Sequence, residues 1–273
     1  MSARAATVSA SGRSHQSEGT LAIHRTLPEE VPVALVFNGT TQAVMMASPA
    51  DLADFALGFA LTEGIVTDPS QVEDFQLVEH AQGIEARFLL DDGRARALSE
   101  RRRYLAGPVG CGLCGIDSLE QALRRVPRVT SDLRLEVSDV ARATDALRRH
   151  QRLHDMTRAT HAAGFMTSGR GVFMAREDVG RHNALDKLIG ALAHEGVDAT
   201  QGAAVMTSRL SIELVQKCAL AGIPVLVAVS APTGAAVRLA QEAGITLAAF
   251  ARGGGFDIYS HQHRIIDETP HVA

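Results

Sequence analysis

The 273-residue chain has few cysteines, few aromatic residues and no strong charge of either sign. Three cysteines are too few for the disulfide framework of a small secreted protein. No apolar run approaches the roughly 20 residues that cross a bilayer, and residues 1–19 contain no hydrophobic block typical of a secretory signal. A net charge of -4 argues against an overall basic field that would coat nucleic acid. We therefore expect a cytoplasmic globular protein, with no membrane and no nucleic acid among its partners.

Two of the three cysteines lie in a glycine-rich segment, Gly110-Cys111-Gly112-Leu113-Cys114-Gly115. Glycine neighbours leave a thiol accessible, whereas a structural cysteine is normally packed among apolar residues. The Cys-x-x-Cys spacing is also that of a zinc knuckle, but the sequence holds no second pair, so histidines would have to complete the ligand set. Cys218 lies on the apolar face of a predicted helix and is expected in the core. We therefore interpret residues 110–115 as a reactive thiol loop without a metal.

The first part of the chain predicts a small α+β unit. Residues 1–20, rich in alanine, serine and glycine, are expected to be a disordered tail. Strands are expected at 31–37, 43–46, 75–79 and 84–90, the first two joined by an Asn38-Gly39 turn. Ser48 as cap and Pro49 as first helical residue predict the start of a helix whose apolar residues recur up to Ala60.

After the cysteine loop, helices predominate to about residue 154, and from residue 162 strands and helices alternate. Helices are expected at 116–124, 137–153, 183–194, 211–221 and 234–243. Strands are expected at 172–175, 203–207, 225–229 and 245–251. This alternation is typical of a layered α/β sheet. We place a domain boundary near residue 130, so that residues 21–130 form an α+β domain ending in the Cys-x-x-Cys loop and residues 131–273 form an α/β domain.

Polar residues gather at four junctions of the predicted sheet, where ligands of α/β proteins bind. The junctions are residues 160–161, 177–183, 208–211 and 252–255. Each polar residue singly could cap a helix or turn a corner. Together, Arg181, Lys187, Arg209 and Arg252, with histidines, glycine amides and helix N-termini, predict a socket for a ligand that carries several phosphates.

Several sequence blocks between about residues 21 and 260 resemble the FdhD family, the formate dehydrogenase accessory sulfurtransferases. The blocks are residues 54–59, 63–65, 111–115, 160–163 and 177–187, followed by Ser211, Glu213, Lys217, Pro232, Thr233, Phe250, Arg252 and Tyr259. The block 177–187, Glu-Asp-Val-Gly-Arg-His-Asn-Ala-Leu-Asp-Lys, is the longest and highly specific. The chain departs from the family pattern at Thr207-Ser208-Arg209, where Ser-Gly-Arg is common, and at Gly234-Ala235.

The resemblance implies a sulfur relay. A cysteine desulfurase would load sulfur onto a loop cysteine as a persulfide, and the protein would deliver it to the molybdenum or tungsten of bis-molybdopterin guanine dinucleotide, a bound substrate. Formate dehydrogenase would then receive the sulfurated cofactor. The family fold is similar to that of cytidine deaminases, which implies an α/β, cytidine-deaminase-like layered sheet domain with a smaller α+β N-terminal domain. Deaminase zinc chemistry does not carry over, because no His-x-Glu is followed by Pro-Cys-x-x-Cys here.

Carried onto this sequence, the resemblance makes Cys111 the persulfide-bearing nucleophile and Cys114 its companion. Attack on a persulfide requires a thiolate, which Arg101, Arg102 and Arg103 would favour unless they are only a solvated helix face. Cys114 could release the terminal sulfur as sulfide by forming a disulfide. The residues expected to bind the cofactor are Phe250, Ala251, Arg252, Gly253, Gly254, Gly255, His161, Arg181, His182, Asn183, Lys187 and Arg209.

Two other functions would use these residues differently. A thioredoxin-like dithiol oxidoreductase would use Cys111 and Cys114, but its motif normally follows a strand and an aromatic residue. Here Val109-Gly110 precede it, and the chain has no tryptophan. A non-catalytic chaperone would only shelter the cofactor, and the loss of both cysteines would then be harmless. Strand edges or the hairpin at residues 31–46 could support a homodimer.

Overall fold

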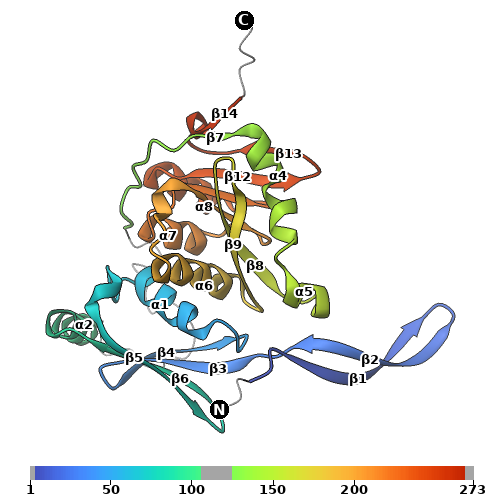
Figure 1. Ribbon diagram of the computed structural model, residues 1–273, viewed down its shortest axis with the longest axis horizontal. Coiled ribbons are helices and arrows are strands. Elements are labelled where there is room, and N and C mark those ends of the chain that lie inside the picture. Colours follow the sequence, from blue (N-terminus) through green and yellow to red (C-terminus); the bar gives the residue numbers. More distant parts are fainter. Residues whose placement is uncertain (1–3, 106–124, 268–273) are drawn as a thin grey trace, which may run out of the picture.

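The computed structural model describes residues 4–105 and 125–267, without the side chains of residues 99–105, and shows a mixed α/β protein (Figure 1). The predicted α/β class is confirmed. The likeness of the layering to cytidine deaminases and the domain boundary near residue 130 stay predictions. Cys111, Cys114 and the helix expected at 116–124 lie outside the described residues. No helix among the described residues is both long and apolar enough to cross a membrane.

The larger sheet has six strands in the order β13-β12-β11-β10-β8-β9. The strands are β8 (His161–Thr167), β9 (Gly171–Asp178), β10 (Ala203–Met206), β11 (Val225–Ala228), β12 (Thr246–Arg252) and β13 (Gly255–Ile258). β10, β11 and β12 are parallel, and their short runs of buried residues are typical of strands covered on both faces.

Helices cover both faces of this sheet (Figure 1). α6 (Arg181–His194), α7 (Ile212–Leu220) and α8 (Gly234–Ala243) contribute to one apolar cluster, and α4 (Val137–Arg148) contributes to a cluster on the other side. α5 (Arg152–Thr157) follows α4, so the single helix expected at 137–153 is interrupted at residues 149–151. A short parallel pair, β7 (Leu135–Glu136) with β14 (Ile265–Ile266), lies beyond β13 (Figure 1).

The smaller sheet has four strands in the order β4-β3-β6-β5. The strands are β3 (Val31–Phe37), β4 (Thr40–Ala47), β5 (Val72–His80) and β6 (Gly83–Leu90), and the helices are α1 (Leu52–Thr62) and α2 (Asp92–Leu105). The predicted turn is confirmed: Asn38 and Gly39 have φ values of 46° and 76°, as the favoured two-residue hairpin requires. The buried side chains of this sheet and α1 form a separate apolar cluster.

The prediction of a disordered tail over residues 1–20 is wrong for residues 7–20. β1 (Thr7–Gln16) and β2 (Gly19–Pro28) pair as an antiparallel hairpin that projects from the body of the molecule (Figure 1). The alanine-, serine- and glycine-rich composition of the segment predicted disorder. Its apolar and polar residues nevertheless alternate with a period of two, which is the pattern of a strand with one packing face.

Three further expectations differ from the structure. α1 begins at Leu52 after Asp51, and Ser48 does not cap it. Ser48 is instead buried, and its N–H donates to Asp178 Oδ2 at 2.9 Å. β8 and β13 were not expected as strands, because their glycine and alanine content weakens the strand signal.

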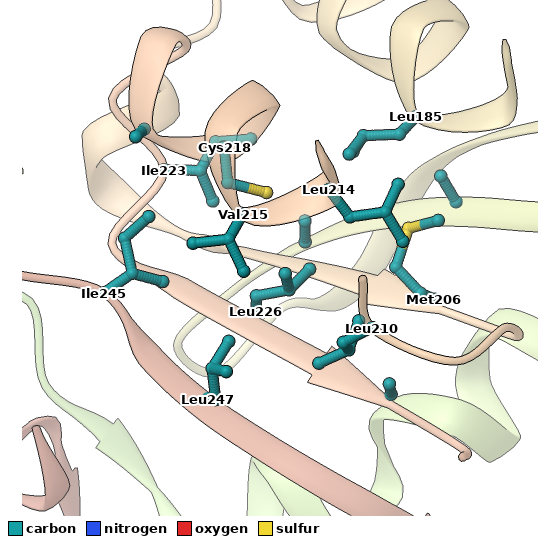
Figure 2. Packing of buried hydrophobic residues seen from close by; sticks show 14 of the residues in the cluster. Leu185, Met206, Leu210, Leu214, Val215, Cys218, Ile223, Leu226, Ile245 and Leu247 are labelled. Atoms are coloured by element: carbon teal, nitrogen blue, oxygen red, sulfur yellow. The ribbon is translucent and has the colours of Figure 1, made fainter. Parts of the chain in front are cut away.

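Cys218 lies in the core, as predicted. Figure 2 shows its sulfur on α7 near Ile223, in the cluster that includes Leu214 and Val215. The side chain is fully buried, and burial raises the pKa of its thiol to about 12. A thiol that remains protonated and enclosed is chemically inert.

Candidate functional site

The four predicted junctions lie along one edge of the six-stranded sheet, called here the junction edge. β8 runs antiparallel to β10, so that Ala163 pairs with Met206 and the start of β8 lies beside the end of β10. His161 in turn pairs with Asp178 at the end of β9. Since β11 and β12 run parallel to β10, the turn at residues 252–255 lies at the same edge. From β12 to β8 this edge extends over about 14 Å, or three strand spacings.

Three helices begin at the junction edge. α6 begins after Gly180 and α7 after Ser211, and neither residue makes a side-chain capping hydrogen bond. Only α8 is capped in this way, by Thr233 Oγ1, which accepts from the N–H of Ala236 at 3.2 Å. Within the described residues no side chain caps α6, so its first-turn amides remain available. In the first turn of α7 the Glu213 carboxylate already accepts hydrogen bonds from Ser211 and from its own N–H. Free amides at the start of a helix bind anions and phosphates well.

Two histidines lie between these helix starts. His161 Nδ1 is 3.4 Å from Thr207 Oγ1, and burial and the positive charge of Arg181 lower the pKa of His161. His182 Nε2 is 3.5 Å from Ser211 Oγ and 3.9 Å from Glu213 Oε2. Burial, followed by the charges of Arg181 and Lys217, lowers the pKa of His182 to about 4. The ring of His182 is therefore neutral at pH 7 and can donate or accept a hydrogen bond.

The positive charge of the site comes from arginines. Arg181 at the start of α6 has a buried Nε with no hydrogen-bond partner in the described part of the chain. Arg209 and Arg252 are exposed at the two neighbouring junctions. A buried donor without a partner is uncommon in folded proteins. Guanidinium groups beside free helix amides fit a ligand with several phosphate oxygens.

The turn between β12 and β13 is shaped by backbone conformations that favour glycine. Gly253 and Gly254 have φ values of 61° and 79°, and Phe250 adopts a positive φ of 54°. A Cβ built on Gly253 or Gly254 would meet nothing within 4 Å, so the loop is open to an approaching ligand. Ala251 is buried, and its carbonyl accepts from Thr144 Oγ1 at 2.8 Å, which fixes the base of the loop.

Glu177, at the β8–β9 end of the junction edge, accepts hydrogen bonds from the start of α5 and from Thr160. Its two carboxylate oxygens accept from the N–H groups of Leu153 and His154, at 2.7 and 2.8 Å, and so cap the start of α5. Glu177 Oε1 also accepts from Thr160 Oγ1 at 3.2 Å. The carboxylate therefore positions the segment that leads into His161. From the sequence, only its place in the block 177–187 marks this residue, and no capping role for it is evident there.

Asn183 and Lys187 were expected to contact a ligand, but the structure places both side chains inside the protein. Lys187 is fully buried, with Nζ 2.7 Å from Asp178 Oδ2 and 3.0 Å from the carbonyl oxygen of Ser48. Asn183 Nδ2 donates to the carbonyl oxygen of Met46 at 2.8 Å and to Asp178 Oδ1 at 3.0 Å. Their polar groups are therefore occupied by protein atoms, and they join α6 to the end of β4 and to Ser48 just after it.

A second buried ion pair joins Asp186, the residue before Lys187 on α6, to Lys217 on α7. Lys217 Nζ is 2.9 Å from both carboxylate oxygens of Asp186 and donates to Thr62 Oγ1 at 2.9 Å. Burial raises the pKa of Asp186, and the Lys217 ammonium opposes that shift. This cluster joins α6 and α7 to α1, so much of the block 177–187 serves to hold the two parts of the molecule together.

Comparison with known proteins gives a family and a fold. Residues 28–266 match the model of the FdhD/NarQ family. A sulfur carrier protein FdhD from Agrobacterium fabrum is 53% identical over 251 residues, which are 91% of this chain and 93% of the relative. A protein of the same name from Bordetella bronchiseptica is 52% identical over 237 residues, 87% of this chain and 86% of the relative. The crystal structure of a formate dehydrogenase accessory protein from Desulfotalea psychrophila superposes with a TM-score of 0.77 at 22% identity, and covers 96% of this chain and 100% of its own.

Proposed function

Because the chain belongs to the FdhD/NarQ family, we propose that it is a sulfur carrier that serves a formate dehydrogenase. It accepts sulfur from a cysteine desulfurase and transfers it to bis-molybdopterin guanine dinucleotide, which it binds as a substrate. The relay operates in the cytoplasm, where thiols stay reduced. Identity of about one half to proteins named sulfur carriers, over nearly the whole chain, is the observation that carries this proposal.

The sulfur is carried by Cys111. Its thiolate attacks the terminal sulfur of the desulfurase persulfide, so that a new S–S bond forms on Cys111 and the desulfurase cysteine leaves as a thiolate. Attack by the Cys114 thiolate on Cys111 Sγ then releases the terminal sulfur as sulfide to the metal. The disulfide left between Cys111 and Cys114 is reduced by a dithiol before the next cycle.

The junction edge is the part of the described molecule best suited to the cofactor. Its free helix amides and the guanidinium groups of Arg181, Arg209 and Arg252 match the pyrophosphate groups of a dinucleotide. Its length of about 14 Å along the strand ends suits an extended ligand. The glycines at 253–255 let backbone amides approach phosphate without a side chain between them.

The direct test is mass spectrometry of the protein after incubation with a cysteine desulfurase and cysteine. We expect one added sulfur, 32 Da, on the peptide that contains Cys111. Cys111→Ala should abolish the addition and leave formate dehydrogenase inactive while the cofactor still binds. Cys218→Ala is the matched control and should load normally.

If the double variant of Cys111 and Cys114 supports full formate dehydrogenase activity, the protein is a chaperone. Rapid reduction of generic disulfides would instead indicate an oxidoreductase.

A further inference from the structure

The short helix α5 is capped by a carboxylate from another element of the fold. Gln151, the residue before α5, makes no side-chain capping hydrogen bond. The N–H groups of Leu153 and His154 donate instead to Glu177 on β9. The carboxylate thus satisfies two donors that the helix leaves unpaired, and its charge lies at the positive end of the helix. Because a helix of six residues is not stable alone, we expect the position of α5 to depend on this contact.

The same carboxylate holds the start of β8. Thr160 is 6% exposed, and its hydroxyl donates to Glu177 Oε1 at 3.2 Å. The carbonyl oxygen of Thr160 lies 3.1 Å from His154 Nδ1, on the helix that Glu177 caps. Ala162 pairs with Glu177 in the ladder between β8 and β9. His161 lies between Thr160 and Ala162, so its backbone is fixed from both sides by contacts with Glu177.

The ring of His161 has one nitrogen beside a protein hydroxyl and one nitrogen free. Nδ1 lies 3.4 Å from Thr207 Oγ1, which accepts from the N–H of Ala162 at 2.9 Å and can donate its own proton to the ring. The proton of the neutral ring then lies on Nε2, which has no hydrogen-bond partner in the described part of the chain. An imidazole N–H near the guanidinium group of Arg181 suits a phosphate oxygen.

We propose that Glu177 is a positioning residue for the ligand of the junction edge: through Thr160 it holds His161 where Nε2 can donate to a phosphate group. This inference rests on the proposed binding of a dinucleotide cofactor at that edge. Glu177 does not contact the ligand itself, because N–H and O–H donors of the protein occupy both of its carboxylate oxygens. The sequence blocks 160–163 and 177–187 thereby serve one purpose.

Calorimetry with guanosine diphosphate on the full chain tests the effect on binding. Glu177→Gln should weaken binding about tenfold, because an amide has only one acceptor oxygen and turns its NH₂ group toward a protein donor. His161→Ala should weaken binding by a similar factor. In the His161→Ala background, Glu177→Gln should have little further effect, since both changes remove the same hydrogen bond. A purely structural role for Glu177 would instead give the same loss in both backgrounds.

Asp198→Asn is the matched control, because it also changes a capping carboxylate to an amide. Asp198 Oδ1 accepts from the N–H of Thr200 at 2.9 Å at the start of a short 3₁₀ helix. That helix leads into β10, so it lies at the edge of the sheet opposite the junction edge. The control should bind guanosine diphosphate as the parent protein does.

NMR titration of the His161 ring tests the positioning without any ligand. In the parent protein, burial and then the charges of Arg181 and His154 lower the pKa of this ring. Glu177→Gln should raise that pKa toward its ordinary value, because the ring becomes more exposed. Removing a negative charge alone would lower the pKa, so a rise reports movement of the ring. Asp198→Asn should leave the pKa of His161 unchanged.

Thermal unfolding shows whether each variant is folded. If Glu177→Gln does not fold, Thr160→Val removes only the link from the carboxylate to β8 and should give the same two effects. An unchanged pKa of His161, or an equal loss of affinity with and without His161, would overturn the proposal. A parent protein that binds no guanosine diphosphate would reject the proposed nucleotide site, whereas the titration would still decide whether Glu177 positions His161.

Discussion

Gly58 of α1 and Gly190 of α6 lie back to back where the two helices cross. A Cβ built on Gly58 would lie 1.8 Å from the carbonyl oxygen of Asp186 and 2.9 Å from the backbone N of Gly190. A Cβ on Gly190 would lie 1.9 Å from the carbonyl oxygen of Asp54. The helices can approach this closely only because both positions lack a side chain. The crossing joins the four-stranded sheet unit to the six-stranded sheet unit.

Gly190→Ala should destabilise the protein by more than about 3 kcal/mol, because the new methyl group meets rigid backbone rather than a movable side chain. Urea denaturation followed by circular dichroism measures the loss. Gly234→Ala is the control: it is also helical, but its Cβ would meet only the end of the Arg238 side chain at 3.5 Å. That substitution should leave stability unchanged or raise it slightly. Equal effects of the two substitutions would contradict the close crossing.

Lys187→Met should cost about 3–5 kcal/mol, because it leaves the Asp178 carboxylate buried without its counter-charge. Adding Asp178→Asn to Lys187→Met should cost less than the two separate losses combined, because the pair is coupled. Chemical denaturation of the four proteins of this double-mutant cycle measures the coupling. If Lys187→Met kept full stability and lost only cofactor binding, Lys187 would contact the ligand, as the sequence first indicated.

The sequence predicted the elements well where a local pattern dictates them. The turn at Asn38-Gly39 and the helix at 234–243 were placed correctly, since both depend on neighbouring residues. The crossing at Gly58 and Gly190 could not be predicted, because nothing local pairs residues 132 positions apart. The β1–β2 hairpin was not predicted, because a serine- and glycine-rich composition outweighed its alternating pattern.

The free energy of unfolding should decrease as the pH is lowered from 6.5 to 4, because of His182. In the folded protein burial lowers the pKa of this ring to about 4, from an ordinary value of 6.5. The unfolded chain therefore binds a proton in this range that the folded protein does not, so folding is penalised as the pH decreases. At a side-chain exposure of 32%, we expect this contribution to be about 2 kcal/mol.

His182→Gln should remove that part of the pH dependence, leaving stability above pH 7 nearly unchanged. Denaturation curves at pH 7, 5.5 and 4 compare the two proteins, and NMR titration of the His182 ring reports its pKa directly. A ring that titrates near 6.5 in the folded protein would contradict the buried, neutral state.

For the candidate site, the sequence grouped the junctions but did not distinguish the polar residues that face inward. Residues 160–161, 177–183, 208–211 and 252–255 were grouped correctly, because strand ends in an α/β sheet converge on one edge. Which polar residues face inward depends on tertiary packing. Lys187 and Arg181 are six residues apart on α6, yet one is fully buried in an ion pair and the other leaves Nε unpartnered.

Arg181→Ala and Arg252→Ala should each weaken the binding of guanosine diphosphate about tenfold or more, since each removes a charge-assisted hydrogen bond to phosphate. Calorimetry measures the affinity, and persulfide loading of the same variants should be intact. Arg149→Ala is a matched control, because Arg149 is exposed beside the β8–β9 turn at the opposite edge of the sheet. An affinity equal to that of the parent protein in both junction-edge variants would argue against nucleotide binding there.

Cys218 should resist alkylation and persulfide loading in the folded protein. Its thiol is fully buried on α7, and burial raises its pKa to about 12, so almost no thiolate exists at pH 8. Incubation with iodoacetamide, followed by peptide mass spectrometry, should leave Cys218 unmodified until denaturant is added. Cys218→Ser would then lower stability without changing sulfur loading, because it places a hydroxyl group in an apolar cluster. Alkylation of Cys218 in the native protein at the rate of a free thiol would show that this part of the core opens. Sulfur found on the protein could then lie on Cys218 as well as on the cysteines of residues 110–115.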